Sequence, residues 1–225
     1  MTNKAKIREI FTSIQGEGPY VGTKQLFIRF CGCNLNCAYC DTDFEAAKSK
    51  DYTVEELINK INEYGEIFTI SLTGGEPLCS VAFLKDFLPE IRKYGHKIYL
   101  ETNATLPEAL ERIIDSVDVV SADIKLASST GMNIDSVVYE KFYSLASKKE
   151  CFAKVVFNEA ISDEEINFCV SIAQKYGLLL ILQPEMKGND FSVTSEFSEI
   201  IFEKFYTKYS NIRLIPQVHK FINLR

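Results

Sequence analysis

Three cysteines within eight residues, Cys33, Cys37 and Cys40, constrain this chain more than any other feature. A closed zinc site takes four protein ligands, so three thiolates leave such a site incomplete. A cluster of four irons held by three cysteines instead keeps one iron open for a substrate or cofactor. Because iron–sulfur clusters deliver electrons at potentials down to about −700 mV, the spacing C-x3-C-x2-C indicates redox chemistry.

A fourth cysteine, Cys31, keeps two alternatives open. Four cysteines would close a zinc site, and a C-x-x-C pair alone would suit thiol redox chemistry. Cys31 ends an apolar run, 25–31, that is typical of a strand. We expect Gly32 to break this strand, so that Cys31 and Cys33 do not share a face.

Charge and cysteine content narrow the location and the partners. Seven cysteines without an export signal favour reduced thiols, so we expect a cytoplasmic protein. No apolar run is long enough to span a bilayer, which predicts no membrane association. A net charge of −6 without clustered Lys and Arg disfavours nucleic acid as a partner.

Apolar strands alternate with helical segments along the 225 residues, which fit one domain, 1–225. This alternation is typical of βαβ units, and it predicts an α/β fold with a mainly parallel sheet. About six units favour a partial or modified (β/α)6 barrel, because a complete barrel needs about 250 residues. An open doubly wound sheet is the alternative. We expect strands at 7–12, 25–31, 67–72, 97–100, 117–120, 152–157, 178–182 and 212–215, and helices at 53–64, 80–94, 136–146, 162–176, 193–209 and from 107.

Polar residues follow the predicted strands directly. In a parallel α/β fold the carboxyl ends of the strands share one rim, where such folds place their sites. We therefore expect one mouth that collects the cysteine loop and the segments 73–77, 101–103, 121–123, 183–185 and 216–219.

The strand end Thr73-Gly74-Gly75-Glu76-Pro77, combined with the cysteine spacing, resembles the radical S-adenosylmethionine superfamily. Together with the segments 14–18, 27–29, 101–103, 123–125 and 217–220, it looks like the 7-carboxy-7-deazaguanine synthase family. The resemblance implies a radical SAM lyase that converts 6-carboxy-5,6,7,8-tetrahydropterin to 7-carboxy-7-deazaguanine with loss of ammonia, on the route to queuosine. It implies a [4Fe-4S] cluster, S-adenosylmethionine and Mg²⁺ as cofactors, and a 5′-deoxyadenosyl radical that abstracts the C6 hydrogen.

The same resemblance assigns the site residues. The carboxylate of Glu17 matches the paired N–H donors of a pterin edge, and Arg29 matches a substrate carboxylate. At Arg225 the family's usual ending differs in residue type, so the terminal carboxylate rather than the guanidinium is the candidate group. The resemblance assigns the cluster to Cys33, Cys37 and Cys40; Mg²⁺ to Thr42; S-adenosylmethionine to Gly75, Ser121, Ala122, Asp123, Gln183, Pro184, Glu185 and Met186; and the pterin to Ile14, Gln15, Gly16, Glu17, Arg29, Thr73, His219 and Arg225.

The partners follow from the same resemblance. It implies an external electron donor, flavodoxin-like or ferredoxin-like, and a homodimer. Two other functions stay in competition: an activase that forms a glycyl radical on a partner protein, and a non-enzymatic zinc or iron–sulfur binding module. An activase shares the cysteines and the glycine pair but gives no role to Gln15-Gly16-Glu17 or Gln217-Val218-His219.

Overall fold

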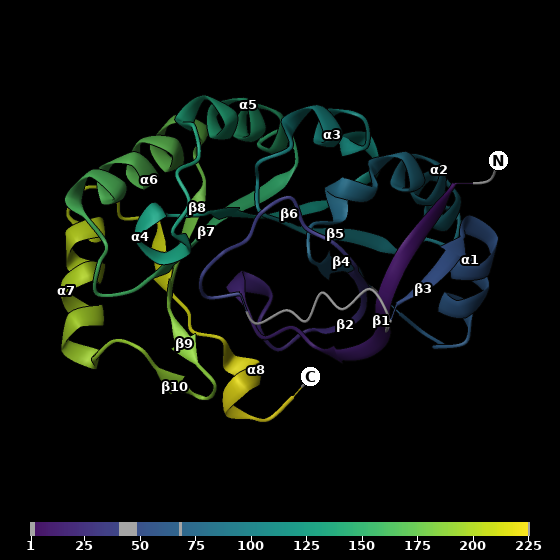
Figure 1. Cartoon of the computed structure of the whole chain (residues 1–225), viewed down its shortest axis with the longest axis horizontal. Helices are drawn as coiled ribbons and strands as arrows, with labels where there is room; N and C mark the ends of the chain where they lie inside the picture. Colours follow the sequence, from purple (N-terminus) through teal and green to yellow (C-terminus); the bar gives the residue numbers. More distant parts are fainter. Residues whose placement is uncertain (1–2, 41–48, 68, 225) are drawn as a thin grey trace.

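A curved sheet of nine strands forms the body of the protein, with the longer helices arranged along its convex side (Figure 1). The structure, a computed structural model, describes residues 3–40, 49–67 and 69–224. The sheet contains, in spatial order, β11 (Ile212–Leu214), β8 (Leu179–Pro184), β7 (Glu150–Phe157), β6 (Val119–Ile124), β5 (Lys97–Thr102), β4 (Thr69–Gly74), β2 (Lys24–Phe30), β1 (Lys4–Ile14) and β3 (Lys50–Thr53).

The convex side is covered by the helices that connect these strands. They are α1 (Val54–Asn62), α2 (Val81–Arg92), α3 (Pro107–Glu111), α5 (Ser136–Ala146), α6 (Asp163–Tyr176) and α7 (Ser195–Tyr206). Shorter elements are α4 (Ala127–Thr130), α8 (Val218–Phe221), the 3₁₀ turns at Gly18–Tyr20, Pro77–Ser80 and Ile114–Ser116, and a hairpin of β9 (Met186–Lys187) and β10 (Asp190–Phe191).

Strands β2, β4, β5, β6, β7, β8 and β11 are parallel, and β1 is antiparallel to both β2 and β3. Among the described residues β3 and β11 form opposite edges, so the sheet curves without closing. The prediction of a partial, mainly parallel barrel is confirmed. A doubly wound sheet is wrong for this chain, because Figure 1 shows these helices on one side only.

Side chains alternate between the two faces of each strand. On the convex face Ile28, Leu100 and Leu182 are fully buried in the core beneath the helices. On the concave face a smaller apolar cluster closes the bottom of the barrel: Tyr99, Val119, Phe152 and Ile181. The concave positions nearer the strand ends are mostly polar, and they form the upper layer that the site uses.

Local sequence signals account for most element boundaries. Capping boxes at Thr53 and Ser162 begin α1 and α6, with the side chains of Glu56 and Glu165 returning to the cap residues. Strand β2 ends at Phe30, and Gly32 takes a φ of +89°, which confirms the expected break before Cys33.

Several predicted boundaries are wrong. The strand expected at 67–72 lies at Thr69–Gly74 and includes the first glycine of the pair. Ser121 to Asp123 lie inside β6, and Gln183 and Pro184 lie inside β8, rather than after these strands. The strand β3 was not predicted at all; it exists because β1 extends to Lys4 and offers a second edge to pair with. In the described parts of the chain no helix is long and apolar enough to cross a membrane.

Candidate active site

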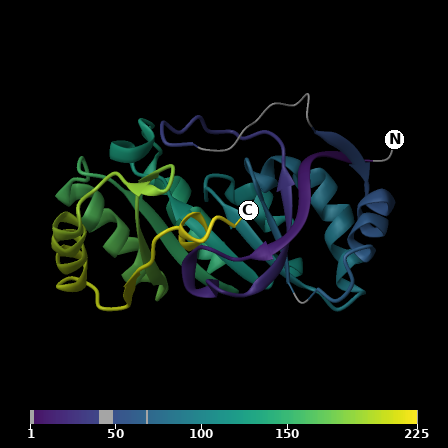
Figure 2. The same cartoon turned by 90° about the horizontal axis from the view of Figure 1, so that it is seen from below.

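A cavity of about 430 Å³ lies on the concave side of the sheet. It is bounded by the strand ends, the cysteine loop, the turn after β1 and the C-terminal segment, and Figure 2 shows the last two elements crossing this side. The predicted rim therefore exists as a single mouth. It brings together these predicted site residues: Ile14, Gln15, Gly16, Glu17, Arg29, Cys33, Cys37, Cys40, Thr73, Gly75, Asp123, Gln183 and His219.

Other predicted site residues lie behind the lining of this cavity. Ala122 is fully buried in the core beneath the helices. Ser121 is buried lower on β6, and Pro184, Glu185 and Met186 continue past the cavity at the end of β8. Thr42 and Arg225 lie outside the described residues.

The three predicted cluster cysteines all line the cavity, whereas Cys31 is absent from its lining. Burial raises the pKa of Cys33 and of Cys37, and nearby thiols raise both further. The backbone N–H of Leu35 donates to Cys33 Sγ at 3.4 Å. Within residues 3–40, 49–67 and 69–224, no group of three His, Cys, Asp or Glu side chains is already arranged around a metal position. The three cysteines are suitable ligands for a cluster held by three thiolates, because all of them line this cavity. Their thiols, however, do not converge on one point in this structure.

The glycine pair at the end of β4 allows the backbone of β4 to lie close to that of β2. Gly74 has a φ of +112°, and a Cβ there would lie 2.3 Å from the carbonyl oxygen of Phe30. The N–H of Gly75 donates to the same oxygen at 3.1 Å. Only glycine fits at position 74, and its fit brings the start of the cysteine loop against β4.

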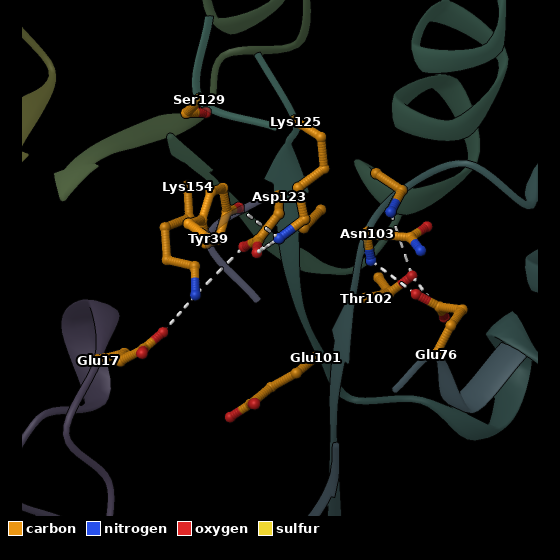
Figure 3. A network of polar contacts seen from close by, with 12 residues as sticks. Glu17, Tyr39, Glu76, Glu101, Thr102, Asn103, Asp123, Lys125, Ser129 and Lys154 are labelled. Carbon is orange, nitrogen blue, oxygen red and sulfur yellow. Dashed lines mark hydrogen bonds and ion pairs between the residues drawn. The ribbon is translucent and has the colours of Figure 1, made fainter. Parts of the chain in front are cut away.

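The carboxylate of Glu76 fixes the neighbouring strand end. It accepts hydrogen bonds from the N–H of Asn103 at 2.7 Å, the hydroxyl of Thr102 at 2.9 Å and the N–H of Leu78 at 3.0 Å (Figure 3). Burial raises the pKa of Glu76 to about 7 against the effect of these donors. The Asn103 amide, placed in this way, donates to Asn34 Oδ1 at 2.9 Å in the cysteine loop.

One buried acceptor on the cofactor side of the cavity has no partner. Gln183 is 3% exposed, and its Oε1 accepts no hydrogen bond from any described residue. Buried side-chain acceptors are nearly always paired in folded proteins. An amide oxygen that lines the cavity in this state suits a ligand with an N–H or O–H donor, such as an amino acid cofactor.

The turn after β1 carries the carboxylate of Glu17 into the cavity. Gln217 donates to Glu17 Oε1 at 2.6 Å, and Lys154 forms an ion pair with Glu17 Oε2. Burial alone would raise the pKa of Glu17, but the Lys154 ammonium and these hydrogen bonds bring the pKa down to about 2. The group is therefore a carboxylate at neutral pH and an acceptor for ligand N–H donors.

A second carboxylate, that of Glu101 on β5, joins two predicted substrate residues. Gln15 donates to Glu101 Oε1 at 2.9 Å, and Thr73 donates to Glu101 Oε2 at 2.6 Å. Gln15 also accepts the N–H of Glu17 at 3.1 Å, which ties the turn to the strand end. Arg29 lies at the other side of the mouth, 3.4 Å from a carboxylate oxygen of Glu9.

The C-terminal segment closes the cavity by contact with Gly16. The N–H of Val218 donates to the carbonyl oxygen of Gly16 at 2.9 Å. A Cβ at position 16 would lie 2.3 Å from His219 Nδ1 and 2.5 Å from His219 Cβ. Gly16 is therefore required for the close approach that brings His219 to the mouth.

Replacing Gly16 by alanine is expected to displace α8. The added methyl group overlaps His219, and the loss of the hydrogen bond from Val218 releases the helix, so we expect trypsin to cleave after Lys220 about tenfold faster. Mass spectrometry of timed digests measures this rate. Gly95→Ala is the control for adding a methyl group, because this methyl meets nothing within 4 Å; Gly95, unlike Gly16, has a positive φ, so the control also includes the cost of backbone strain. Equal cleavage in both variants would contradict the role given to Gly16.

The charged side chains that connect the predicted residues were not predicted. Lys154 was read as part of an apolar strand, although a lysine within Phe152–Phe157 must be paired if it is buried. Glu101, Lys125 and Gln217 lie in the segments 101–103, 123–125 and 217–220, which carry the family resemblance, but no role was predicted for them. Side chains alternate between the two faces of a strand, which places Glu101 of β5 and Lys154 of β7 on the concave face. This alternation was the signal that could have identified these two residues.

Comparisons with known proteins identify the family of this chain. A family model described as the radical SAM superfamily matches residues 27–142, which contain the cysteine loop and the glycine pair. The crystal structure of QueE from Escherichia coli matches 96% of this chain and 95% of that chain with a TM-score of 0.67. Its sequence identity is 20%, so this match shows the fold alone.

Full-length relatives define the family more closely. The 7-carboxy-7-deazaguanine synthase of Geobacter sulfurreducens is 32% identical over 97% of both chains. That of Archaeoglobus fulgidus is 33% identical over 99% of this chain and all of the relative. With these matches along its whole length, the chain belongs to the 7-carboxy-7-deazaguanine synthase family of the radical SAM superfamily.

Proposed function

We propose that this radical SAM enzyme converts 6-carboxy-5,6,7,8-tetrahydropterin to 7-carboxy-7-deazaguanine with loss of ammonia. A single cavity contains both the three cysteines and the ionised carboxylate of Glu17, which can accept hydrogen bonds from a ligand. This observation carries the proposal. The curated relatives bear the name of this activity over nearly their full length. The cell would use the product in the synthesis of queuosine or a related 7-deazapurine, and we place the enzyme in the cytoplasm.

Membership of the superfamily implies a [4Fe-4S] cluster and S-adenosylmethionine as cofactors. When bound, this pair supplies a 5′-deoxyadenosyl radical for abstraction of the C6 hydrogen of the pterin. We assign the cluster to Cys33, Cys37 and Cys40, because all three line the same cavity. We assign S-adenosylmethionine to the backbone at Gly75, the segment 121–123 and the segment 183–186, where the amide oxygen of Gln183 accepts no hydrogen bond from the described part of the chain.

The pterin would occupy the other half of the cavity. Glu17 would accept the paired N–H groups of the pterin edge, with Gln15 and Gly16 beside it. Thr73 and His219 would line the ring, with Ile14 at the edge of the mouth, and Arg29 would pair with the substrate carboxylate. Closure by the C-terminal segment would exclude water from the reacting carbon.

We also propose that the enzyme binds Mg²⁺, with Thr42 as its protein ligand. A single hydroxyl ligand suits Mg²⁺, which keeps several waters and takes further oxygens from the substrate. Removal of divalent cations with a chelator is expected to reduce deazapurine formation to a small fraction, and added Mg²⁺ should restore it. Thr42→Ala should raise the Mg²⁺ concentration needed for half-maximal turnover. Full turnover in the presence of chelator would contradict this assignment.

Turnover with the pterin as the sole substrate separates this function from its alternatives. The proposed synthase needs no protein substrate, whereas a glycyl-radical activase forms product only with its partner protein. A binding module gives neither product nor cleaved S-adenosylmethionine. We further propose a flavodoxin-like or ferredoxin-like donor for the cluster, a homodimer, and a role for Arg225 at the substrate.

A further inference from the structure

Lys154 lies between the two halves of the cavity. It extends from β7, is 8% exposed, and its ammonium forms ion pairs with Glu17 and, at 3.3 Å, with Asp123 Oδ1 (Figure 3). Asp123 is the β6 residue directly beside Lys154 in the sheet register. Glu17 belongs to the proposed pterin half and Asp123 to the proposed S-adenosylmethionine half, so one side chain contacts both.

The contacts continue beyond Lys154 in both directions. Lys125 donates to Asp123 Oδ2 at 2.7 Å and to the hydroxyl of Tyr39 at 2.9 Å. Tyr39 stands between Cys37 and Cys40 in the cysteine loop. At the other end, Gln217 of the C-terminal segment donates to Glu17. A continuous row of polar contacts therefore connects the closing segment to the cysteine loop, with Lys154 as its central member.

We propose that Lys154 is a positioning residue that holds the Glu17 carboxylate ionised and in place for the pterin edge, at a fixed separation from the cofactor half. This inference rests on the proposed function and deepens it. Lys154 binds the pterin through Glu17 rather than by direct contact. Asp123 keeps a second cation, Lys125, when Lys154 is absent, whereas among the residues that the structure describes Glu17 keeps only the neutral donor Gln217 in hydrogen-bond contact.

The groups around Glu17 explain why a cation is needed. Lys154 of β7 and Lys125, directly after β6, supply positive charge at the cavity, and His219 approaches from α8. Asp123 of β6, Glu101 and Tyr99 of β5 are the acidic groups that face the same space. Without Lys154, the buried Glu17 carboxylate would lose its ion-pair partner, and proton uptake by Glu17 would be the least costly response.

The test measures binding of 6-carboxy-5,6,7,8-tetrahydropterin to the reconstituted holoenzyme with S-adenosylmethionine and without reductant, by isothermal titration calorimetry. Lys154→Met is expected to weaken pterin binding about 100-fold at pH 8. The ratio of variant to wild-type Kd should grow further as the pH falls from 8 to 6, because Glu17 then takes up a proton. Titration of the pterin and of other groups cancels in this ratio. Binding of S-adenosylmethionine should weaken far less.

Two further variants separate positioning from a merely structural role. Lys154→Arg should restore most of the pterin affinity, because it returns the cation. In a Glu17→Gln background, Lys154→Met should add little to the loss of affinity, because the residue acts through Glu17. This double variant also lacks the unpaired carboxylate, so it stays informative if the single variant does not fold. Lys175→Met is the control: Lys175 makes a similarly close ion pair with Glu140 on the protein surface.

Each outcome decides the proposal. A pH-dependent loss of pterin affinity that arginine restores and that Glu17→Gln masks supports it. Wild-type pterin affinity in Lys154→Met, or additive losses in the double variant, overturns it and leaves the proposed function intact. An equal loss of pterin and S-adenosylmethionine affinity also overturns it, since that result indicates general disruption. A wild-type enzyme that does not bind the pterin overturns the proposed function, and this inference with it.

Discussion

Replacing Cys37 by alanine is expected to abolish iron–sulfur cluster binding and all turnover. Two thiolates leave a four-iron cluster with two open irons, and no other cysteine of the described chain lines the cavity besides Cys33 and Cys40. Because the cluster carries the electron that starts the reaction, the loss of rate should be complete within detection. Iron and sulfide content, the visible absorption of the cluster and product formation measure this effect together.

Cys31→Ala is the matched control for this prediction. Cys31 is two residues from the motif, but it lies outside the cavity lining, and its N–H donates to the carbonyl oxygen of Lys6 at 2.9 Å, as a continuation of β2. We expect full cluster content and full turnover in this variant. Bound zinc in place of iron, lost on Cys31→Ala, would instead support a four-cysteine zinc site.

Glu17→Gln is expected to reduce kcat/KM for the pterin by a factor of roughly 10⁴, because a buried site built for N–H donors then presents an amide N–H group to them. The pKa of Glu17 is about 2 in the folded protein, against an ordinary value of 4.5. A lowered pKa stabilises the fold above pH 4.5, and the stabilisation is lost as the pH falls from 4.5 towards 2. The shift corresponds to about 3 kcal/mol.

The pH dependence of unfolding tests the electrostatic part of this prediction without any cofactor. Wild type should exceed Glu17→Gln in free energy of unfolding at neutral pH, and the difference should shrink through the window from pH 4.5 to 2. Glu140→Gln is the control, because Glu140 pairs with Lys175 at the surface and should contribute about 1 kcal/mol or less. A constant difference between wild type and Glu17→Gln across this window would refute the proposed charge state.

The position of the candidate site could be predicted from the sequence because its strongest signals are short local motifs. The cysteine spacing, the glycine pair and the turn after β1 each depend on a few adjacent residues, and all of them meet in the cavity. The prediction that polar strand ends share one rim also held, since it follows from parallel strand order alone. The end of β2 before Gly32 was predicted for the same reason: a glycine there permits the positive φ.

The remaining features depend on distances between strands, which single-strand patterns do not contain. Lys154 looked like an exception within an apolar run, and only the register of β6 and β7 places it beside Asp123. Its second partner, Glu17, comes from a turn 137 residues away along the chain. The contact of Gly16 with His219 likewise joins the two ends of the sequence. Such pairings become visible when curvature of the sheet brings distant segments to one face.

Anaerobic turnover with a pterin deuterated at C6 tests the central claim most directly. The reconstituted enzyme would be supplied with dithionite, S-adenosylmethionine and Mg²⁺ as the only other components. The account predicts 7-carboxy-7-deazaguanine and ammonia in equal amounts, with deuterium recovered at the 5′ carbon of S-adenosylmethionine or 5′-deoxyadenosine. Formation of 5′-deoxyadenosine without deuterium and without any deazapurine would contradict it, because the radical would then be made but not used on this substrate.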